Sequence, residues 1–565
     1  MRSVRKGGTE MIKSLIVVFA LFAVNFGAEH RALQAGEAAE QASAAPSGGS
    51  DQTARFTPVE GPDLKSRLAA AIKQARSRSK QTRFWTVHTF DVRPGVGVDI
   101  LIIGSGGSRL DIGGVMHTTD RQYETRNVGV FLLHEADGGA ITRAEIYNLD
   151  RPRDYSGYPV YWLGRATNDE SLSFLKSLID STRLNEVAER ATDAIGLHDD
   201  QRVEAMLKEL IASSRVQNVR ATAVSWLGHF PGQTPYLSAI VRNDRENVEV
   251  RKEAADALGD SIDDGALSAL ERLYGEVGNR EVKAEILDSI ADSRDEAAAT
   301  RFLIKVSETD PDRELRREAI DGLGESQDPA SLKALEKIIS DSNTDSELQG
   351  EAVDAIGEKG HDVAAPLLMR IAKTHPNAEV RKEAIDHLGE IPGQLSFLVE
   401  VARNESENLD LRKEAIDAIG ESPDADGMKT LQALFSAITH REVRREILDA
   451  ISESSDREAA LNFLIKVARS DSDAEVREEA LSGLGEMNDD RAVEALADLY
   501  ASERSEEVKE EILDALAESN TKRGLRKLIE VAKSDPSPKM RRKAIEALGE
   551  SDDPEAAEFL ERIIR

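Results

Sequence analysis

The residues of this chain whose types and spacing could support chemistry are carboxylates that recur at a regular interval. In eight short stretches a Glu is followed three residues later by an Asp, and a ninth stretch has the Glu alone, at Glu479. Successive Glu residues of this series are 31 to 33 positions apart. Such carboxylates could bind divalent cations or attract a basic partner. The sixteen paired residues are Glu253, Asp256, Glu285, Asp288, Glu318, Asp321, Glu351, Asp354, Glu383, Asp386, Glu414, Asp417, Glu446, Asp449, Glu511 and Asp514.

A second candidate is the glycine-rich sequence GSGG at 104–107. It follows an apolar stretch, as a phosphate-binding loop does. However, Arg109 stands where a dinucleotide-binding motif requires its third Gly, and residues 108–114 do not resemble the start of a helix. A glycine-rich hairpin turn is therefore the favoured interpretation.

A third candidate is a group of histidines in the same region. His88, His117 and His134, together with Asp111 and Glu135, are residue types that bind metals. No pair of them has the short spacing of a known ligand motif. Structural or surface histidines are therefore the favoured interpretation.

A basic stretch precedes these histidines in an otherwise acidic chain. It is either a solvated helix face or a contact for an acidic surface, which could be one of the chain's own. Its residues are Lys65, Arg67, Lys73, Arg76, Arg78, Lys80 and Arg83.

The elements that must position the acidic series are the units of an internal repeat. One pattern recurs twelve times: hydrophobic, basic, two variable positions, small or Ile, and then Leu or Ile before a small residue. The clearest copy is VRKEAIDHLG at 380–389. Because each unit can bury its apolar face only against its neighbours, this period predicts a solenoid. The final small residues are Gly196, Gly228, Gly259, Ala291, Gly324, Gly357, Gly389, Gly420, Ser452, Gly485, Ala517 and Gly549.

Counted backward from this small residue, which we call position 0, the pattern predicts an amphipathic helix. Position −9 is Val, Leu or Met, position −5 is Ala or Ile, and position −1 is Leu or Ile in every copy. At 100° per residue these positions and −2 fall within one arc, which should be buried. Gly at position 0 is typical of a left-handed helix C-cap. Another apolar stretch lies between successive copies, so each unit should be a helical hairpin.

These residues resemble HEAT repeats, particularly the HEAT-like repeats of the phycobilin-lyase type. Val-Arg at the start of the second helix and Leu-Gly at its end carry the resemblance, which extends over about residues 168–565. It implies an α-solenoid whose second helices line the inner curve. It implies no single function, because this architecture serves many partners. A di-iron branch of the family uses His-Glu pairs, and the one such pair here, His134-Glu135, lies outside the repeats.

The basic residue of the pattern, at position −8, is Arg or Lys in ten copies. We expect it to reach acidic residues in the preceding turn, such as Asp310 or Asp471, and to join neighbouring repeats.

The acidic residues of the series occupy positions −6 and −3, beside and opposite the buried stripe. Both positions should therefore be exposed. Lys or Arg at position −7 often stands four residues before the Asp and would offset its charge locally. The series is thus either a solvated face or a groove for a basic or extended partner. Helices of neighbouring repeats are about 8–10 Å apart, which argues against a metal shared between their carboxylates.

Composition limits the remaining possibilities. The chain has 565 residues, of which 4% are aromatic and 31% charged, as suits a helical array better than a β-rich enzyme. The net charge of −31 argues against nucleic acid as a partner. The absence of Cys excludes disulfides and a lipidated cysteine anchor.

The domain organisation follows from shifts in composition. Residues 1–28 have basic residues before a short apolar run, as in a signal peptide, and 29–55 are rich in Ala, Ser, Gly and Gln, as in a disordered linker. A helix at 63–75 and strands at 84–92, 98–103, 128–134, 141–148 and 158–163 predict a small α+β domain over 56–167 with an antiparallel sheet. Residues 168–565 are the predicted mainly α solenoid.

The sequence therefore predicts an exported, non-enzymatic scaffold that binds a protein or peptide, a basic one if the acidic face takes part. We expect it in the periplasm or outside the cell, in a bacterial envelope, without a membrane span once the signal is removed. No catalytic, cofactor or metal residues are predicted. An accessory or regulatory subunit of an envelope enzyme, or a lyase-like enzyme of the HEAT-like family, are the alternatives.

Overall fold

The computed structural model describes residues 56–79, 82–103, 109–117 and 123–564. The predicted signal peptide, the predicted linker and the GSGG sequence lie outside the described residues. Contacts divide the chain into two compact units, residues 1–209 and 210–565. Among the described residues, no helix is both long and apolar enough to cross a membrane.

The first unit contains a five-stranded sheet with the strand order β1-β7-β2-β5-β6. A separate antiparallel pair, β3 and β4, has Ile103 opposite Arg109. The strands are β1 (Thr57–Pro58), β2 (Phe84–Thr89), β3 (Val96–Ile103), β4 (Arg109–His117), β5 (Val128–His134), β6 (Ile141–Asn148) and β7 (Val160–Arg165).

The five-stranded sheet is mixed and not antiparallel as predicted. Strand β7 pairs in parallel with β2, because after β6 the chain returns to the far side of β2 and runs in the same direction. Strand β4 was not predicted, since Gly113 and Gly114 within it are residues that usually mark turns.

Alternating side chains of this sheet pack on its two faces. Trp85, Val87 and Phe131 belong to one buried cluster, while Phe84 and Tyr161 belong to another. The second cluster is covered by helix α2 (Leu64–Arg78), which confirms the helix predicted at 63–75. The chain then enters α3 (Asn168–Ser181) and α4 (Asn185–Gly196), and α4 packs against β6.

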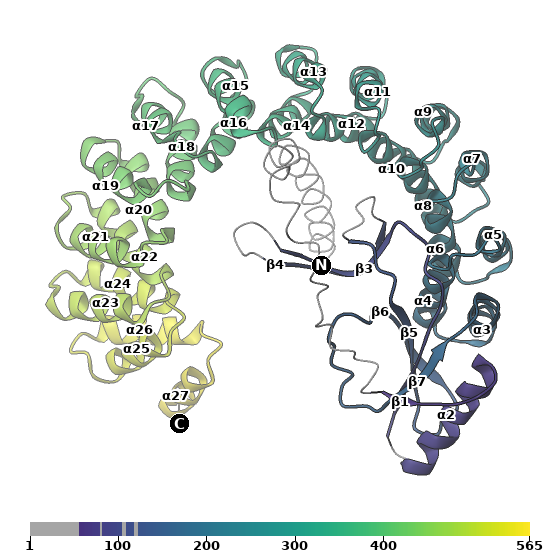
Figure 1. Ribbon diagram of the computed structural model, residues 1–565. Coiled ribbons are helices and arrows are strands. Elements are labelled where there is room, and N and C mark those ends of the chain that lie inside the picture. The colour runs from purple at the N-terminus through teal and green to yellow at the C-terminus, as the bar shows by residue number, and fades with distance from the viewer. Residues whose placement is uncertain (1–55, 80–81, 104–108, 118–122, 565) are drawn as a thin grey trace, which may run out of the picture. The chain divides into compact units, whose positions relative to one another are not determined.

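The twelve predicted helical hairpins are all present. Each position-0 residue lies at the end of an even-numbered helix from α4 to α26, and an odd-numbered helix precedes it. Within residues 210–565 the even-numbered helices form the inner layer of an arc and the odd-numbered helices the outer layer (Figure 1). The remaining helices are α5 (Val203–Ser213), α6 (Gln217–Gly228), α7 (Thr234–Arg242), α8 (Val248–Gly259), α9 (Ala266–Glu276), α10 (Arg280–Ala291), α11 (Glu296–Thr309), α12 (Arg313–Glu325), α13 (Pro329–Ser340), α14 (Ser346–Gly357), α15 (His361–Thr374), α16 (Ala378–Glu390), α17 (Leu395–Arg403), α18 (Leu409–Glu421), α19 (Gly427–Ala437), α20 (Arg441–Glu453), α21 (Arg457–Ser470), α22 (Ala474–Glu486), α23 (Asp490–Ser502), α24 (Glu506–Glu518), α25 (Lys522–Ser534), α26 (Pro538–Gly549) and α27 (Pro554–Ile564).

The predicted buried stripe of the second helices is confirmed. In α8, for example, Val250, Ala254 and Leu258 at positions −9, −5 and −1 are completely buried. The small Ala at position −5 lets the paired helices of a hairpin approach, and the branched residues at −9 and −1 fill the space between hairpins.

The Gly at position 0 does not form the left-handed cap that the sequence suggested. None of the nine glycines at this position, all of which are described, has a positive φ. Instead the glycine lies against position −2 of the next second helix. A Cβ added to Gly228 would be 2.6 Å from the carbonyl oxygen of Ala257, and one added to Gly485 would be 2.5 Å from that of Ala515. The glycine is needed for close approach of two helices.

Two of the three copies that lack Gly at position 0 preserve this contact by exchanging the residue sizes. Ala291 faces Gly322, and Ser452 faces Gly483, so the glycine has moved to position −2 of the following helix. All three copies that lack Gly at position 0 carry Ile in place of Ala at position −5.

This contact predicts different effects for one substitution at equivalent positions. Gly485→Ala should destabilise the array by about 2 kcal/mol, because the new methyl overlaps a backbone oxygen that cannot easily move. Gly549→Ala is the matched control, since Gly549 has no atom within 4 Å of its added Cβ and the variant should be at least as stable as the parent. Urea unfolding followed by circular dichroism measures both. Equal losses in the two variants would contradict the close-approach role.

Candidate functional site

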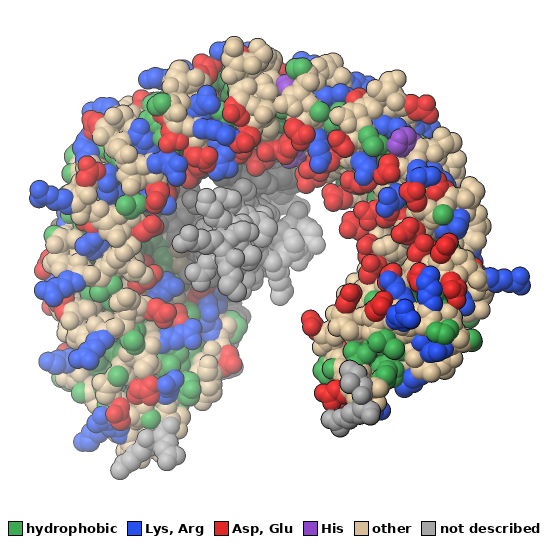
Figure 2. Space-filling model, turned by 180° about the vertical axis from the view of Figure 1, so that it is seen from behind, with side chains coloured by type: hydrophobic (Ala, Val, Ile, Leu, Met, Phe, Trp, Pro, Cys, Tyr) green, Lys and Arg blue, Asp and Glu red, His purple; other side chains and the backbone are tan. Residues whose placement is uncertain are grey.

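The sixteen predicted carboxylates lie on the inner layer of the second unit, on α8, α10, α12, α14, α16, α18, α20 and α24. Together with Glu479 on α22 we call them the inner acidic band. Asp and Glu side chains gather along the inner edge of this arc (Figure 2). The second helices therefore line the inner curve, as the resemblance to HEAT repeats implied.

The Glu residues at position −6 are less exposed than predicted. The side chains of Glu285, Glu414 and Glu446 are only 19%, 15% and 19% exposed. They are partly covered because each one lies against the preceding second helix, from which it receives an ion pair.

This ion pair joins neighbouring repeats. Lys or Arg at position −7 pairs with the Glu at position −6 of the next repeat, and not with the Asp of its own helix as the sequence suggested. The N···O distance is 3.0 Å from Lys382 to Glu414 and 2.6 Å from Arg445 to Glu479. The other pairs of this kind are Lys252–Glu285, Arg317–Glu351 and Lys413–Glu446.

The Asp residues at position −3 face the same Glu of the next repeat. Burial, followed by the negative charges of Glu446 and Glu414, raises the pKa of Asp417 to about 7. Burial and a hydrogen bond with Glu351 raise the pKa of Asp321. The band therefore holds some of its carboxyl groups protonated near neutral pH, which lowers its net negative charge.

A third acidic row runs beside the band, at position +1 of ten successive repeats. All ten side chains are exposed. Burial, Asp449 and Glu518 raise the pKa of Glu486, so this row is electrostatically continuous with position −3. The sequence analysis did not include this row, although an acidic residue follows position 0 in every one of these copies. The residues are Asp260, Asp292, Glu325, Glu358, Glu390, Glu421, Glu453, Glu486, Glu518 and Glu550.

We call the contact between two successive second helices a step of the band. The step from α14 to α16 differs from the others because a histidine lies beside its carboxylates. One ligand atom each from Asp354, Glu383 and His387 lies within 4.8 Å of the other two. The Nε2 atom of His387 is 2.9 Å from Oδ1 of Asp354. The helix spacing had suggested that carboxylates of neighbouring repeats are too far apart to share an ion, but the side chains extend toward one another and close that distance here.

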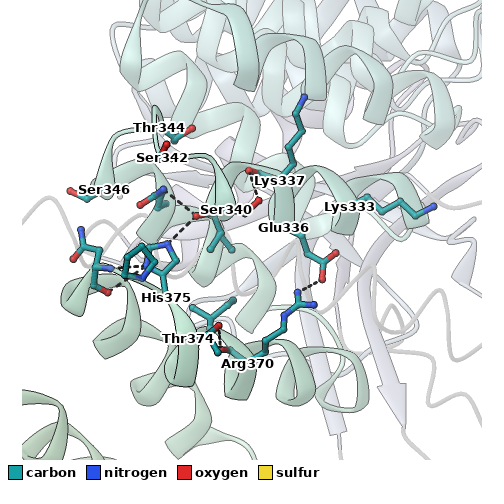
Figure 3. Close-up of a pocket in the computed structure, with 15 residues that line it drawn as sticks. Lys333, Glu336, Lys337, Ser340, Ser342, Thr344, Ser346, Arg370, Thr374 and His375 are labelled. Atoms are coloured by element: carbon teal, nitrogen blue, oxygen red, sulfur yellow. Dashed lines mark hydrogen bonds and ion pairs between the residues drawn. The ribbon is translucent and has the colours of Figure 1, made fainter. Parts of the chain in front are cut away.

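A groove of about 880 Å³ lies on the outer layer, between α13 and α15. Its polar groups are largely paired with each other: Arg370 and Glu336 point toward one another with an N···O distance of 2.6 Å, and His375 bonds the carbonyl of Ile339 (Figure 3). Gln349 also bonds that carbonyl. The groove therefore lacks a convergent set of groups for a charged ligand.

The Arg residues at position −8 connect elements as predicted. Nε of Arg251 bonds the carbonyl of Val241 at the end of the preceding helix, and Nη2 lies 2.9 Å from Asp244 in the turn between them. Arg444 instead pairs with Asp471, in the turn of the next repeat. Of the two acidic residues named from sequence, Asp310 accepts a hydrogen bond from the hydroxyl of Tyr274.

The described histidines of the first unit are buried in its core. His88 bonds the hydroxyl of Ser171, and His134 bonds that of Thr86 while stacking on Phe84. Burial lowers the pKa of His88 to about 3 and that of His134 to about 4, so both rings are neutral and structural. The side chains of His117 and Asp111 lie outside the described residues.

The basic stretch of the first unit has local partners. Arg67 lies 3.5 Å from Glu170, and Arg83 lies 2.7 Å from Glu135. Lys80 lies outside the described residues.

Comparison with known proteins identifies the repeats. The sequence profile of HEAT repeats matches residues 205–291, 276–347, 300–389, 337–408, 395–485, 431–517 and 493–565. No curated protein matches the chain significantly.

Several solved structures are similar. The structure of Kap121p shares 16% identity over 70% of this chain and 49% of its own, with a TM-score of 0.35. That of Kap95p with RanGDP shares 14% over 69% and 60%, with a TM-score of 0.34. The CpcE–CpcF complex of phycocyanin lyase from Nostoc sp. PCC7120 shares 21% over 40% and 92%, with a TM-score of 0.22. This chain thus spans about half the length of Kap121p, and the family profile alone assigns the repeats.

Titration of Asp417 should make the array less stable as the pH rises. Its pKa is about 7 in the folded protein and 3.8 in the free side chain, so between these values the folded state keeps a proton that the unfolded chain loses. Asp417→Asn should flatten the fall in stability across this window and stabilise the protein at about pH 8 by about 1 kcal/mol, after allowance for solvent screening. Urea unfolding at about pH 5 and about pH 8 measures the change.

The control is Asp386→Asn, which changes an exposed Asp at the same position of the preceding repeat. It shows how much of the change follows from removing any one carboxylate of this row. An unchanged slope in Asp417→Asn would contradict the raised pKa.

Proposed function

The chain belongs to the HEAT-repeat family, and we propose that it is an exported, non-enzymatic scaffold that holds a basic, extended protein segment along its inner surface. The observation that carries this proposal is the exposed acidic row at position +1, next to the Asp residues at position −3. These two rows follow the second helices through most of the array, so a bound segment would contact several repeats at once.

The ion pairs within the band determine which carboxylates are available to a partner. Lys or Arg at position −7 offsets the Glu at position −6, which is also largely covered. The repeated ion pair from position −7 ends on the Glu at position −6 and not on positions −3 and +1. An incoming Lys or Arg would therefore meet these two rows first, and its attraction should weaken as salt screens the charges.

Export is supported by the sequence of residues 1–28, with basic residues ahead of a short apolar run. Deletion of residues 1–28 should retain the protein in the cytoplasm, whereas the full chain should fractionate with periplasmic or secreted proteins. Cytoplasmic retention of the full chain would contradict this part of the proposal.

The side chains of the inner acidic band and the histidines of the first unit support a non-enzymatic role. The inner acidic band repeats the same carboxylates at most steps, and His88 and His134 of the first unit are buried and engaged with hydroxyl groups. A binding surface formed from repeated groups gains affinity by adding contacts along its length.

Charge reversal within the row at position +1 should weaken binding of a basic segment. We expect Glu453→Lys combined with Glu486→Lys to reduce affinity for a Lys/Arg-rich peptide of about 15 residues by about tenfold at low salt, mostly through slower association. Fluorescence anisotropy with a labelled peptide, repeated at about 50 mM and about 500 mM salt, measures the loss.

The matched control is Asp498→Lys combined with Glu530→Lys. It changes the net charge equally, but both residues lie on outer-layer helices, α23 and α25. Its affinity for the peptide should remain close to that of the parent protein. Equal weakening in both double variants would show that net charge, and not the inner surface, governs the interaction.

A further inference from the structure

The step from α14 to α16 combines three potential metal ligands from two neighbouring repeats. Asp354 comes from α14, and Glu383 and His387 come from consecutive turns of α16. One ligand atom from each lies within 4.8 Å of the others, and the His387–Asp354 distance is already 2.9 Å. Two carboxylates and an imidazole form a donor set suited to divalent transition metals such as zinc.

No Lys or Arg stands at position −7 before this cluster, in which His387 itself pairs with Asp354. At five other steps, Lys or Arg at position −7 pairs with the Glu of the next repeat. At this step position −7 is Gly350, and the nearby Lys382 pairs with Glu414 of the following repeat. Position −7 is also non-basic at Ala284 and Glu478, but at this step the lack of a basic residue coincides with the three ligands.

Packing does not explain Gly350. A Cβ added there would have no atom within 4 Å, and its φ is not positive. A glycine inside a helix costs about 1 kcal/mol relative to alanine. Its consequence for the surface is to leave Glu383 without a Lys or Arg from position −7.

His387 is also unusual for its position. It occupies position −2, where the other repeats from α8 onward have Ala, Ser or Gly. Its ring lies over Gly357, where an added Cβ would be 2.6 Å from Nδ1. This contact holds Nε2 toward Asp354, while Oε2 of Glu390 lies 3.7 Å from Nδ1 on the opposite side of the ring. A carboxylate behind a histidine is the usual outer partner of a metal-binding imidazole.

We propose that Asp354, Glu383 and His387 bind one divalent transition-metal ion such as zinc. The bound ion would link helix α14 to helix α16. Nε2 of His387 and one oxygen from each carboxylate supply three ligands, and the open inner surface leaves the fourth position to water. Ligands of tetrahedral zinc are about 3.4 Å apart, so binding must replace the 2.9 Å hydrogen bond between Nε2 of His387 and Oδ1 of Asp354 and open that distance slightly. The ion would supply the positive charge that Gly350 omits.

Zinc titration of the full chain, after treatment with a chelator, tests the proposal. Isothermal calorimetry should give one equivalent of bound zinc per chain, and saturation should raise the temperature of unfolding. His387→Ala should weaken binding at least about tenfold. This variant introduces the Ala found at position −2 of most repeats, so it should fold normally, which circular dichroism checks.

Gly350→Lys is an independent test that changes no ligand. It introduces the cation present at other steps, for which there is room, and should expel the ion by pairing with Glu383. Glu414→Gln, at the equivalent position of the next repeat, is the control and should bind zinc as the parent does. The proposal is overturned if the parent binds no zinc at millimolar concentration, or if His387→Ala and Gly350→Lys bind it as tightly as the parent.

Discussion

The close contact between position 0 of one second helix and position −2 of the next is the constraint on which the array depends. A pair of such residues has room for little more than one methyl group. The pairs Gly228 with Ala257, Gly259 with Ser289 and Ala291 with Gly322 satisfy this limit in two opposite ways. The constraint acts on the sum of two side chains, which is why neither position is invariant. The step from α24 to α26 has Ala at both positions, and at the step from α14 to α16 the larger ring of His387 lies over Gly357, so this limit holds at most steps but not at every one.

The same approach of the helices sets the electrostatics of the inner surface. It brings positions −7 and −3 of one helix against position −6 of the next, so that cations and carboxylates of neighbouring repeats interact directly. Covering these groups raises the pKa of Asp417, and like charges add to the effect. Because each partly exposed ion pair contributes at most about 1 kcal/mol, the pairs adjust a surface whose helices are held mainly by apolar packing. The acidic band is thus a consequence of the repeat geometry as well as a surface for binding.

The sequence was sufficient for features that depend on one helix, and insufficient for those that depend on two. The period identified all twelve hairpins, and the buried stripe followed from the pattern of Val, Ala and Leu. The role of Gly at position 0 was misjudged, because a C-cap and a close contact favour the same residue. The exposure of Glu414 was overestimated, since only the neighbouring repeat covers it. Parallel pairing of β2 with β7 depends on a long connection whose direction no local pattern encodes.

The regular copies of the repeat suit recognition of a long partner, whereas the copy at 348–357 suits recognition at one defined position. Residues 280–306 match residues 441–467 at 17 of 27 positions, five repeats away, and even the edge-to-face pairs Tyr274–Phe302 and Phe435–Phe463 are reproduced. Duplication of a block of repeats copies its surface side chains as a set, so that the same carboxylates recur at regular intervals along the array.

The copy at 348–357 departs from the pattern, with Gln349-Gly350 in place of Arg-Lys. Gln349 still bonds the carbonyl of the preceding helix, as Arg251 does in its own repeat. Gly350 lacks the ammonium that would neutralise Glu383. Repeated carboxylates attract a long partner without regard to register, whereas the contact between α14 and α16 is the one place among the described residues where a His joins two carboxylates in this way. A partner or ion that requires one defined location should be recognised there.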